Sequence, residues 1–454
     1  MRQWMVAAKK ADFYAIAEKF HVDPVVARII RNREVIGEKN IRIYLGGNLS
    51  DLSDPHQMKD MDRLVEILAQ KIRKQVHIRI IGDYDVDGVT SSHLFLTALR
   101  RVGAKVDVVI PHRIQDGYGL SLHLLQQAKE DGVDTILTCD NGIAAIDEIA
   151  WAKAQKMTVL VTDHHAVPFE EHEGRRTEKK SLADAVVNPH QQDCGYPYKE
   201  LCGAGVAWNV IRVLYENYDM DKREAEDLLD FVAMATVCDV MSLTGENRIL
   251  VKEGLKRIRH TKNIGLQALM QACNVQPENI SAYHFGYVLG PCVNATGRLD
   301  TARHALRLFE TGQETEAEEI ARDLVDLNQE RKELTLQGVE MAKKLCEEGG
   351  YENDPVLVLF LPDVHESIAG LIAGRIREMY NRPVFVLTRG EEGVKGSGRS
   401  TENYSMYENM CGCAELFTKF GGHPMAAGVS LPEENVEKFR RKINENCPLT
   451  VEEV

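Results

Sequence analysis

The sequence predicts an α/β protein with a doubly wound, mostly parallel sheet, joined by a long helix to a second, smaller α/β domain. Short apolar runs alternate with amphipathic segments from Val76 onward, a pattern typical of parallel strands covered on both faces. A proline-free helical stretch covers residues 301–349, and strand–helix alternation resumes after Gly349-Gly350. A chain of 454 residues is also too long for one hydrophobic core. Two or more domains are therefore expected.

The first part of the chain, residues 1–70, shows amphipathic helical patterns and no chemical motif, and we assign it to an N-terminal helical segment. Five strands are predicted in the domain that follows, over residues 71–300: Val76–Gly82, Val106–Pro111, Thr135–Asp140, Thr158–Asp163 and Ala185–Asn188. Helices are expected between and after them: Val89–Arg101, Ser121–Glu130, Ile143–Ala154 and most of residues 204–272. This alternation predicts the doubly wound sheet.

The rest of the chain divides into a connector and a second domain. Residues 301–349 are expected to form one rigid helical connector, and residues 350–454 the smaller α/β domain. In that domain the expected elements are a helix at Ile368–Tyr380 and four strands: Val356–Leu361, Val384–Leu387, Val394–Ser397 and Ala427–Leu431. The polar segment Glu170–Lys180 of the first domain is expected to be an exposed loop.

The composition is that of an ordinary globular protein, with 44% hydrophobic and 27% charged residues. The formal net charge of −14 argues against a protein that coats nucleic acid through bulk electrostatics, although a local basic groove can still hold a few phosphates. No apolar run is long enough to span a bilayer, and no signal peptide is visible. Ten scattered cysteines are typical of reduced thiols. We therefore expect a cytoplasmic protein without membrane spans or disulfides.

The sharpest feature is the segment Gly82-Asp83-Tyr84-Asp85-Val86-Asp87-Gly88, which lies between an apolar strand and a helix. Its three carboxylates alternate with other residues. Carboxylates a few ångströms apart repel each other by about 1 kcal/mol per pair in water, and by more when they are partly buried. A protein that places Asp83, Asp85 and Asp87 at the mouth of a sheet therefore usually supplies a cation, and we assign all three to a catalytic site.

The same segment has a calcium-binding alternative, because Asp83-x-Asp85-x-Asp87-Gly88 matches the opening of an EF-hand loop. The last position of such a loop requires a bidentate glutamate, and Leu94 stands there. A strand also precedes the segment, where an EF-hand has a helix. Both observations disfavour the calcium loop.

Other predicted elements also end in acidic residues. One strand ends at Asp140, followed by Asn141-Gly142, another ends at Asp163, followed by His164-His165, and an apolar helical segment ends at Asp239. Ligands gather at the carboxyl ends of parallel strands, so these side chains are expected to converge with the first cluster. Taken alone, a His-His pair or a single Asp is more often structural. Oxygen ligands with one or two imidazoles suit Mn²⁺ or Mg²⁺ better than Zn²⁺ or Co²⁺.

Two glycine-rich segments near the C-terminus are candidates for phosphate binding: residues 395–400 (Lys-Gly-Ser-Gly-Arg-Ser) and residues 420–428 (Phe-Gly-Gly-His-Pro-Met-Ala-Ala-Gly). Glycines let backbone N–H groups approach a phosphate, and an arginine adds a forked cation, although each cluster alone is more often a turn. Residues 248–262 are rich in Lys and Arg. This basic segment lines a DNA path or forms a solvated helix face, and the sequence leaves both interpretations open.

Taken together, these residues resemble a known family. The motifs Asp85-x-Asp87, Asp140-Asn141-Gly142, Asp163-His164-His165 and Asp239 follow the order of the DHH phosphoesterase motifs. Further segments resemble the RecJ-like exonucleases in particular: Gly82–Ser91, Val187–Pro189, Cys202–Ala207, Asp239–Arg248 and Gly290–Arg298. The resemblance runs from about Val76 to about Leu431. It implies a DHH catalytic domain over residues 71–300 and a DHH-associated, substrate-binding domain over residues 350–454.

The resemblance also implies roles for individual residues. Two divalent cations, Mn²⁺ or Mg²⁺, would be held by five ligands: Asp85, Asp87, Asp140, His164 and Asp239. Asp83 and His165 would complete the catalytic set beside them, and Asp163 would orient an imidazole. The implied substrate-binding residues lie in the later motifs: Asn294 and Arg298 at the scissile phosphate, and Ser397, Arg399, Gly421, Gly422 and His423 at the terminal nucleotide.

The implied function is a metal-dependent exonuclease that hydrolyses phosphodiester bonds of single-stranded DNA by two-metal catalysis. The family likeness implies 5′-to-3′ cleavage, release of nucleoside 5′-monophosphates, and a role in DNA repair and recombination. One alternative is a DHH phosphodiesterase of short oligoribonucleotides or cyclic dinucleotides. Another is a non-catalytic nucleic-acid-binding replication factor, which is disfavoured because every expected acid is present. A family pyrophosphatase is disfavoured because Ile81 stands where its motif has an imidazole.

The expected partners are single-stranded DNA and a single-strand-binding protein, and the chain is expected to act as a monomer. Familiar bacterial members of the resembled family continue past the second domain into an oligonucleotide-binding β-barrel, whereas this sequence ends at Val454. The sequence is therefore expected to be a trimmed or a short family member. Affinity for long DNA and processivity are the properties that this difference leaves open.

Overall fold

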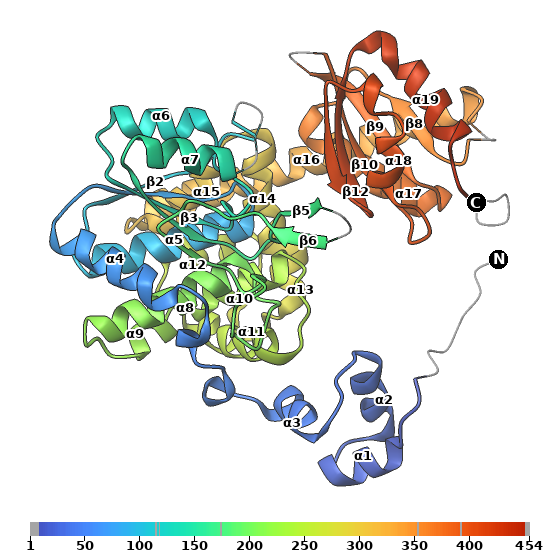
Figure 1. The fold of residues 1–454 in the computed structure, drawn as a ribbon. Helices are drawn as coiled ribbons and strands as arrows, with labels where there is room; N and C mark the ends of the chain where they lie inside the picture. Colours follow the sequence, from blue (N-terminus) through green and yellow to red (C-terminus); the bar gives the residue numbers. More distant parts are fainter. Residues whose placement is uncertain are drawn as a thin grey trace. The chain divides into compact units, whose positions relative to one another are not determined.

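The computed structural model describes residues 9–449, except residues 114–115, 118, 173–174, 352–353 and 391–392. The chain forms two compact units, Met1–Val325 and Asp326–Val454. The division falls within the longest described helix, α16 (Glu314–Glu348), as Figure 1 shows. The predicted fold class, two α/β parts joined by a long helix, is confirmed. The finer division at residues 70, 300 and 349 stays a prediction.

The first unit is built around a five-stranded parallel sheet with the order β2-β1-β3-β4-β7. Its strands are β1 (Ile78–Ile81), β2 (Val106–Val109), β3 (Thr135–Cys139), β4 (Thr158–Thr162) and β7 (Ala185–Val187), so all five predicted strands are confirmed. From β1 the chain crosses to one side of the sheet, and from β3 it crosses to the other. The loops after β1 and β3 therefore diverge, and this topological switch point is where α/β sheets bind ligands.

Helices cover both faces of this sheet, because the side chains of each strand alternate between two apolar clusters. Ile78 and Ile80 pack with helices α4 (Met61–Arg73), α5 (Val86–Arg101) and α8 (Gly203–Asn217). Ile81 belongs to the opposite cluster, with α6 (Leu122–Glu130) and α7 (Ile146–Ala154). The doubly wound arrangement that the continuous apolar strands predict is therefore present.

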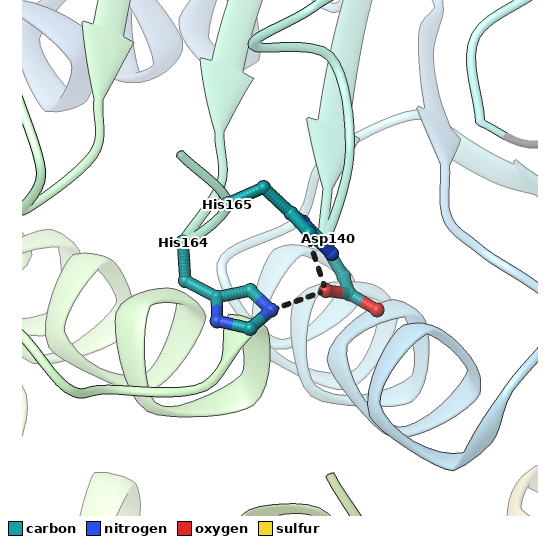
Figure 2. A group of neighbouring side chains, drawn as sticks. All are labelled: Asp140, His164 and His165. Carbon is teal, nitrogen blue, oxygen red and sulfur yellow. Dashed lines mark ion pairs between the residues drawn. The ribbon is translucent and has the colours of Figure 1, made fainter. Parts of the chain in front are cut away.

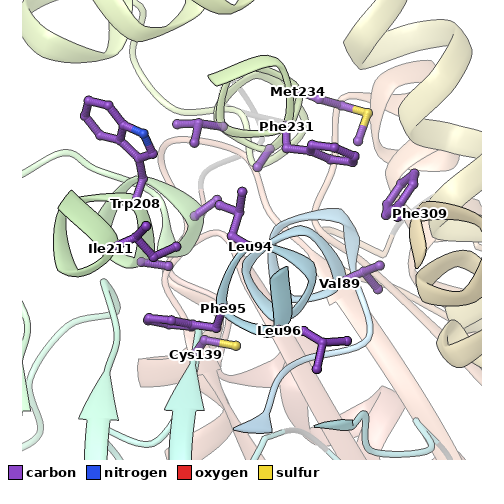
Figure 3. Packing of buried hydrophobic residues seen from close by; sticks show 14 of the residues in the cluster. Val89, Leu94, Phe95, Leu96, Cys139, Trp208, Ile211, Phe231, Met234 and Phe309 are labelled. Carbon is purple, nitrogen blue, oxygen red and sulfur yellow. The ribbon is translucent and has the colours of Figure 1, made fainter. Parts of the chain in front are cut away.

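Helix α5 lies at the centre of the larger cluster and is buried on nearly all sides. Figure 3 shows its residues Val89, Leu94, Phe95 and Leu96 among side chains of α8, α10 (Leu229–Cys238), α15 (Ala302–Glu310) and β3. The buried residues of α5 include Thr90, Ser91, Ser92 and His93, so polar as well as apolar side chains of this helix are enclosed by the protein. Asp85 is the N-cap of α5 and Asp87 lies in its first turn, so the packing of this helix fixes the position of the Asp85-x-Asp87 motif.

The other described helices complete the two units. In the first unit they are α1 (Phe13–Phe20), α2 (Pro24–Asn32), α3 (Glu38–Gly46), α9 (Arg223–Glu226), α11 (Gly245–Arg257), α12 (Ile264–Ala272), α13 (Ala282–His284), the π-helical η5 (Phe285–Leu289) and α14 (Gly290–Leu299). Short 3₁₀ turns are η1 (Leu49–Asp51), η2 (Pro55–Gln57), η3 (Ile258–His260), η4 (Pro277–Asn279), η6 (Glu366–Ile368), η7 (Ala414–Leu416) and η8 (Glu433–Asn435). Within the described residues, no helix combines the length and the apolar character needed to cross a bilayer.

The prediction of one continuous connector over residues 301–349 is wrong at its start. Residues 302–310 form the separate helix α15, whose apolar face is buried in the core of the first unit. The chain breaks after Glu310, and Glu316 in the first turn of α16 accepts hydrogen bonds from Arg307 and from Thr311. These bonds join the end of α15 to α16 across the break. The connecting helix therefore begins only at Glu314.

The prediction that Glu170–Lys180 is a loop is also wrong, because strands β5 (Phe169–His172) and β6 (Arg175–Glu178) pair antiparallel there. The segment was predicted to be a loop because its side chains are polar. Strand pairing depends on backbone N–H and C=O groups, which can bond whatever the side chains are. Residues 173–174 of this segment lie outside the described residues.

The second unit contains a five-stranded sheet with the order β11-β12-β10-β9-β8, in which only β8 and β9 are parallel. Its strands are β8 (Leu357–Phe360), β9 (Val384–Gly390), β10 (Gly393–Arg399), β11 (Lys419–His423) and β12 (Ala426–Leu431). Helix α17 (Ala369–Tyr380) packs on one face with the end of α16, and α18 (Met406–Cys411) and α19 (Val436–Glu445) pack on the other. The four predicted strands are present, and β11 was not predicted.

Close packing of α10 and α11 leads to a first test of this fold. A Cβ atom on Gly254 of α11 would lie 2.2 Å from the carbonyl oxygen of Leu229 and 2.3 Å from Cβ of Ala233. Gly254→Ala is therefore expected to lower the free energy of unfolding by about 1–3 kcal/mol, because these backbone atoms must move apart. Gly46→Ala, at a helical glycine with open space around it, is the matched control. Thermal unfolding measures both, and equal stability of the two variants would contradict this packing.

Candidate metal centre

The predicted acidic residues meet at the carboxyl edge of the parallel sheet. Asp83 follows β1, Asp140 follows β3 and Asp163 follows β4, while Asp239 forms the C-cap of α10. β1 and β3 are the two neighbours at the switch point of the sheet. The topology therefore brings together residues from four segments that are far apart in the sequence.

Asp140 lies at the centre of this group and has an unusual backbone conformation. Its φ is +61°, a left-handed value that costs energy in a residue other than glycine and is concentrated at functional sites. The start of α8 approaches it so closely that a Cβ on Gly203 would lie 2.6 Å from Cβ of Asp140. Only glycine fits at position 203 without moving Asp140.

The His164 imidazole faces three carboxylates. Its Nε2 lies 3.0 Å from Oδ1 of Asp140, and 3.7 Å from Oδ2 of both Asp87 and Asp239. Figure 2 shows the rings of His164 and His165 directed at the same oxygen of the Asp140 carboxylate. Among the described residues, three groups of side chains have ligand atoms within 4.8 Å of one another: Asp140 with His164 and His165, Asp87 with His164 and Asp239, and Asp83 with Asp85 and Asp140.

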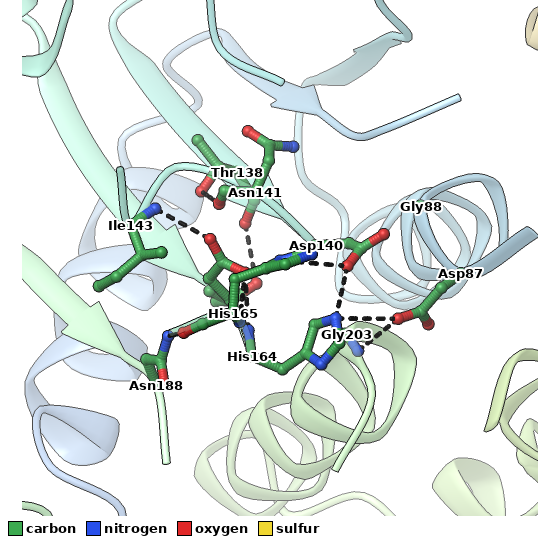
Figure 4. Close-up of polar contacts among 12 residues, drawn as sticks. Asp87, Gly88, Thr138, Asp140, Asn141, Ile143, His164, His165, Asn188 and Gly203 are labelled. Carbon is green, nitrogen blue, oxygen red and sulfur yellow. Dashed lines mark hydrogen bonds and ion pairs between the residues drawn. The ribbon is translucent and has the colours of Figure 1, made fainter. Parts of the chain in front are cut away.

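Two helix N-termini hold the acidic loop in place. Oδ2 and Oδ1 of Asp87 accept hydrogen bonds from the backbone N–H groups of Gly203 (2.6 Å) and Ala204 (2.8 Å) at the start of α8, as Figure 4 shows in part. Asp85 is the N-cap of α5 and accepts from the N–H of Gly88 at 3.0 Å. The positive ends of both helices favour carboxylates at these positions.

Asp163 is the buried anchor of the two histidines. Its Oδ1 accepts hydrogen bonds from the backbone N–H groups of His164 (2.7 Å) and His165 (3.0 Å), and it contacts Nδ1 of His165 at 2.8 Å. Its Oδ2 accepts from the N–H of Ile143. Asn188 donates to the carbonyl oxygen of His165. The expected orienting bond of Asp163 therefore goes to the His165 ring, while His164 is positioned through its backbone.

Burial and mutual repulsion shift the protonation of these acids. Burial, reinforced by the charges of Asp87 and Asp85, raises the pKa of Asp140 well above its usual value and raises the pKa of Asp239 to about 8. Burial and the neighbouring Asp85 do the same to the pKa of Asp83. Without a cation, the low-dielectric site can keep these carboxylates together only by protonating some of them.

The two imidazoles are shifted in opposite directions. Burial lowers the pKa of His164, which favours the neutral ring that can ligate a metal. Burial also opposes the charged form of His165, but its hydrogen bond and charge interaction with Asp163 outweigh this and raise its pKa to about 9. His164 is therefore the better metal ligand, and His165 adds positive charge at neutral pH.

The donor set fits a hard divalent cation. At this centre, Oδ1 of Asp83 and Oδ2 of Asp239 are buried and have no hydrogen-bond partner in the described part of the chain. Buried polar atoms without partners are rare, and a bound ion is one of the few ways to satisfy them. Carboxylate oxygens with one imidazole suit Mn²⁺ and Mg²⁺.

Three cysteines lie directly before residues of this centre: Cys139 before Asp140, Cys202 before Gly203 and Cys238 before Asp239. Burial, and to a smaller degree the nearby carboxylates, raises the pKa of Cys139 to about 12, and the pKa values of Cys202 and Cys238 are raised for the same reasons. All ten cysteines are free thiols. These thiols stay protonated and are poor metal ligands.

Helix α14 lies against the acidic loop. Oδ1 of Asn294 accepts a hydrogen bond from the N–H of Val86 at 3.1 Å. A Cβ on Gly297 would lie 2.3 Å from the carbonyl oxygen of Tyr84, so the helix touches the loop backbone. The half-buried Arg298 follows on this helix, and its positive charge interacts with Tyr84 in the same loop. Asn294 thus supports the acidic loop, and both predicted residues lie beside the centre.

In the second unit, the structure corrects the role given to the glycines of residues 395–400. Strand β10 pairs with β9 on one side and β12 on the other, so its backbone N–H groups are used in the sheet. Gly396 and Gly398 instead leave room for core side chains, since a Cβ there would lie 2.2 Å from Leu387 and 2.4 Å from Met406. Phosphate contacts of this strand must therefore come from side chains.

Ser397 and Arg399 lie on the other face of β10, against the first turn of α17. A Cβ on Gly370 in that turn would lie 2.8 Å from Nη2 of Arg399 and 3.4 Å from Cβ of Ser397. A guanidinium and a hydroxyl at a helix N-terminus form a favourable environment for a phosphate. Gly370 was not among the predicted site residues. The small residues Ala369-Gly370 at the start of the predicted helix could have indicated a close approach of another strand or a ligand.

The second glycine-rich segment, residues 420–428, forms most of the edge strand β11, a turn at Pro424-Met425 and the start of β12, so its Gly-Gly-His lies in a strand. Across β12, Gly421 lies in register with Ser397 through Gly428, and His423 lies in register with Arg399 through Ala426. Gly422 follows Gly421 on the same strand. The small residues of β12 therefore lie between the predicted substrate-binding residues of β10 and those of β11. Because neighbouring strands are ~4.8 Å apart, the backbones of β10 and β11 are about 10 Å apart.

The basic segment 248–262 serves largely structural contacts. Arg248 donates to the carbonyl oxygen of Tyr44 and lies over the Tyr44 ring, 3.8 Å from its centroid. Lys252 donates to the carbonyl oxygen of Gly47. Lys256 and Arg257 pair with glutamates. This segment therefore docks the N-terminal helices, and its contacts do not favour a DNA path.

Comparison with known families matches both halves of the chain. A model described as the DHH family, N-terminal domain, matches residues 77–236, and a model described as the DHHA1 domain matches residues 353–447. The single-stranded-DNA-specific exonuclease RecJ of Haemophilus influenzae is 36% identical over 440 residues, which cover 93% of this chain and 74% of that protein. RecJ of Bacillus subtilis is 34% identical over 97% of this chain. The chain spans only 54% of the Bacillus subtilis protein.

Solved structures show the same similarity. A crystal structure of exonuclease RecJ bound to manganese has a TM-score of 0.75 and 32% identity, and the match covers 87% of this chain and 97% of that one. RecJ of Thermus thermophilus in complex with Mg²⁺ has a TM-score of 0.74 and 28% identity, over 95% of this chain and 58% of that one. The metals in these structures are the two that the donor set favours.

The protonated carboxyls predict how metal affects stability. An acid whose pKa is higher in the folded than in the unfolded chain releases a proton when the protein unfolds. The metal-free protein is therefore expected to lose stability as the pH rises from about 4 to about 8, the range over which the pKa of Asp239 is raised by folding. Mn²⁺ replaces these protons and should stabilise more at pH 8 than at pH 6. At about one hundred times its dissociation constant the gain is about 2.7 kcal/mol.

Thermal unfolding with and without Mn²⁺ at the two pH values measures this effect. Asp140→Asn keeps the shape of the side chain but removes its charge, and it should abolish the gain from Mn²⁺. Asp147→Asn, at an exposed aspartate on α7, should leave it unchanged. Equal stabilisation of Asp140→Asn and the parent protein would refute the metal assignment.

Proposed function

Because the chain belongs to the RecJ family of DHH phosphoesterases, we propose that it is a metal-dependent exonuclease of single-stranded DNA. The observation that supports this most directly is the meeting of Asp87, Asp140 and Asp239 around the His164 imidazole. A relative that is 36% identical to this chain over 440 residues is named a single-stranded-DNA-specific exonuclease. The proposed products are nucleoside 5′-monophosphates, released in the 5′-to-3′ direction during DNA repair and recombination.

In this proposal Mn²⁺ or Mg²⁺ is held by five side chains: Asp85, Asp87, Asp140, His164 and Asp239. The protein is proposed to bind two such ions, since the ligand atoms form more than one group. When bound, the metals lower the pKa of a water and neutralise charge on the phosphoryl oxygens. The chain's own contribution is to hold these ligands in a buried site before the substrate arrives, so that little reorganisation is needed during the reaction.

The residues around the ligands position the substrate and balance its charge. The backbone N–H groups of Gly203 and Ala204 hold Asp87, and Asp163 orients the His165 ring. Arg298 adds positive charge where the phosphate binds and where negative charge develops during hydrolysis. Asp83 completes the acidic loop, and Asn294 fixes the backbone of that loop at Val86.

The second unit is proposed to bind the terminal nucleotide. Ser397 and Arg399, at the first turn of α17, would hold its phosphate, and His423 in register across the sheet would contact it from β11. Gly421 and Gly422 leave space beside them. Capture of a strand end makes cleavage exonucleolytic, because the bond presented to the metals is then always near that end.

The remaining proposals concern the setting of the activity. We place the enzyme in the cytoplasm, where free thiols persist. It would act as a monomer on single strands that a single-strand-binding protein presents. Within the residues that the structure describes, no contact favours the short-oligonucleotide phosphodiesterase or the non-catalytic factor over the exonuclease.

A digestion series tests the proposed activity. With Mn²⁺, the protein should degrade a long single strand, release mononucleotides, and spare a blunt duplex. Blocking the 5′ end should stop digestion, and blocking the 3′ end should not. A dinucleotide should be a poorer substrate than the long strand. Preference for the dinucleotide would support the oligonucleotide phosphodiesterase instead.

The variant Asp140→Ala should lower the rate of this digestion by at least about a hundredfold, because it removes a ligand that belongs to two of the three groups of metal donors. Asp147→Ala, at the exposed position on α7, is the control and should digest at the parent rate. Retained activity in Asp140→Ala would mean that the chemistry lies elsewhere.

A further inference from the structure

Two stacked tyrosines are exposed on the helix that runs past the metal centre. Tyr283 and Tyr287 are 62% and 74% exposed, and their rings stack at a centroid distance of 5.2 Å with an interplanar angle of 25°. Single exposed aromatic residues are ordinary on a protein surface. A stacked pair, with both rings largely exposed to water, in a chain with only 6% aromatic residues calls for a reason.

The tyrosines lie on a continuous helical run that contacts the segments of two proposed metal ligands. It consists of α13, the π-helical η5 and α14, from Ala282 to Leu299. Near its end, Asn294 bonds to Val86 in the acidic loop. In its middle, the carbonyl oxygen of Phe285 accepts from Sγ of Cys238, and a Cβ on Gly290 would lie 2.3 Å from the same sulfur. Cys238 directly precedes Asp239, so the run is fixed to both sides of the metal centre.

Several residues of this run are accessible, among them the half-buried His284, Gly286 and Val288. Five of the accessible residues form a stripe: Tyr283, Tyr287, Pro291, Asn294 and Arg298, which are spaced four, four, three and four residues apart. This is the spacing of neighbours along one helix face. One end of the stripe holds Asn294 and Arg298, beside the proposed scissile phosphate, and the other end holds the tyrosine pair.

The π turn lies between these two ends. Pro291 lacks an N–H group and cannot donate to the carbonyl oxygen of Tyr287, and the wider π turn of Phe285–Leu289 comes directly before it. Such π turns are frequent at functional sites. Here the turn presents Tyr287 at the surface while Phe285 and Leu289 stay buried.

We infer that Tyr283 and Tyr287 form a stacking platform for the bases of the single strand as it approaches the metal centre. This inference rests on the proposed function for its substrate. Aromatic rings bind single strands of any sequence, because every base has a face to stack on. At about 1.5 Å per residue, Tyr287 lies about 16 Å along the helix from Arg298. This distance corresponds to about five nucleotides of a stacked strand at ~3.4 Å each.

The distance makes the platform testable by substrate length. Tyr283→Ala/Tyr287→Ala should raise the KM for a single strand of about twenty nucleotides roughly tenfold, with kcat unchanged, because the stacking of about one base on the tyrosine pair is lost. The KM for a trinucleotide should stay within about twofold of the parent value, since it does not reach the pair. Tyr283→Phe/Tyr287→Phe keeps the rings and should restore the parent KM. Tyr14→Ala, at a tyrosine on α1 that is 78% exposed, is the matched control.

A strand with abasic sites from the fifth nucleotide onward supplies a second readout. The parent protein should bind it as weakly as the alanine pair binds the intact strand, and the alanine pair should not distinguish the two strands. A parent-like KM of the alanine pair for the long strand, or an equal increase for the trinucleotide, would overturn the inference.

Binding without divalent metal separates this inference from the proposed activity. Fluorescence anisotropy of a labelled twenty-nucleotide strand reports affinity when no hydrolysis occurs. If the parent protein hydrolyses nothing but the alanine pair still binds about tenfold more weakly, the exonuclease proposal fails and the platform stands. If the parent protein digests the strand and both proteins bind it equally, the platform fails alone.

Discussion

Repulsion among acids that are kept out of water is the constraint on which the rest of this structure depends. Asp83, Asp87 and Asp140 are each at most 2% exposed, and Asp239 lies beside them. In a medium of low dielectric their charges cannot coexist without compensation. The left-handed backbone of Asp140, the missing side chain at Gly203 and the amide groups that hold Asp87 all serve to keep these acids in one place until a cation binds.

The fold supplies part of that compensation itself. The chain leaves β1 and β3 in opposite directions, and the loops that follow them diverge. Helices α5 and α8 begin in this space, so that Asp85 caps one helix and Asp87 faces the first N–H groups of the other. Two helix dipoles thus point at the acidic loop. The parallel sheet determines where the site lies, and the helix ends determine which carboxylates it can hold.

The sequence was informative where the signal is local. Apolar runs predicted the strands, and the acids at their ends predicted which residues meet, because parallel strands share one carboxyl edge. What could not be predicted depends on three-dimensional contacts that leave no pattern in the sequence. The core contacts of α15 and the use of Gly396 and Gly398 for packing are of this kind. Two short-range contacts gave no signal either: the pairing of the polar strands β5 and β6, and the contact of Asp163 with the ring of His165, since both histidines follow the same strand.

The cysteines before Asp140, Gly203 and Asp239 have a consequence for damage to the enzyme. Oxidants and alkylating agents attack the thiolate, and these three thiols are kept protonated and shielded from solvent to different degrees. Oxidation or alkylation of these thiols therefore requires local opening of the segments that bind metal. Bound metal holds these segments in place, so oxidants would react with the metal-loaded protein more slowly than with the metal-free protein.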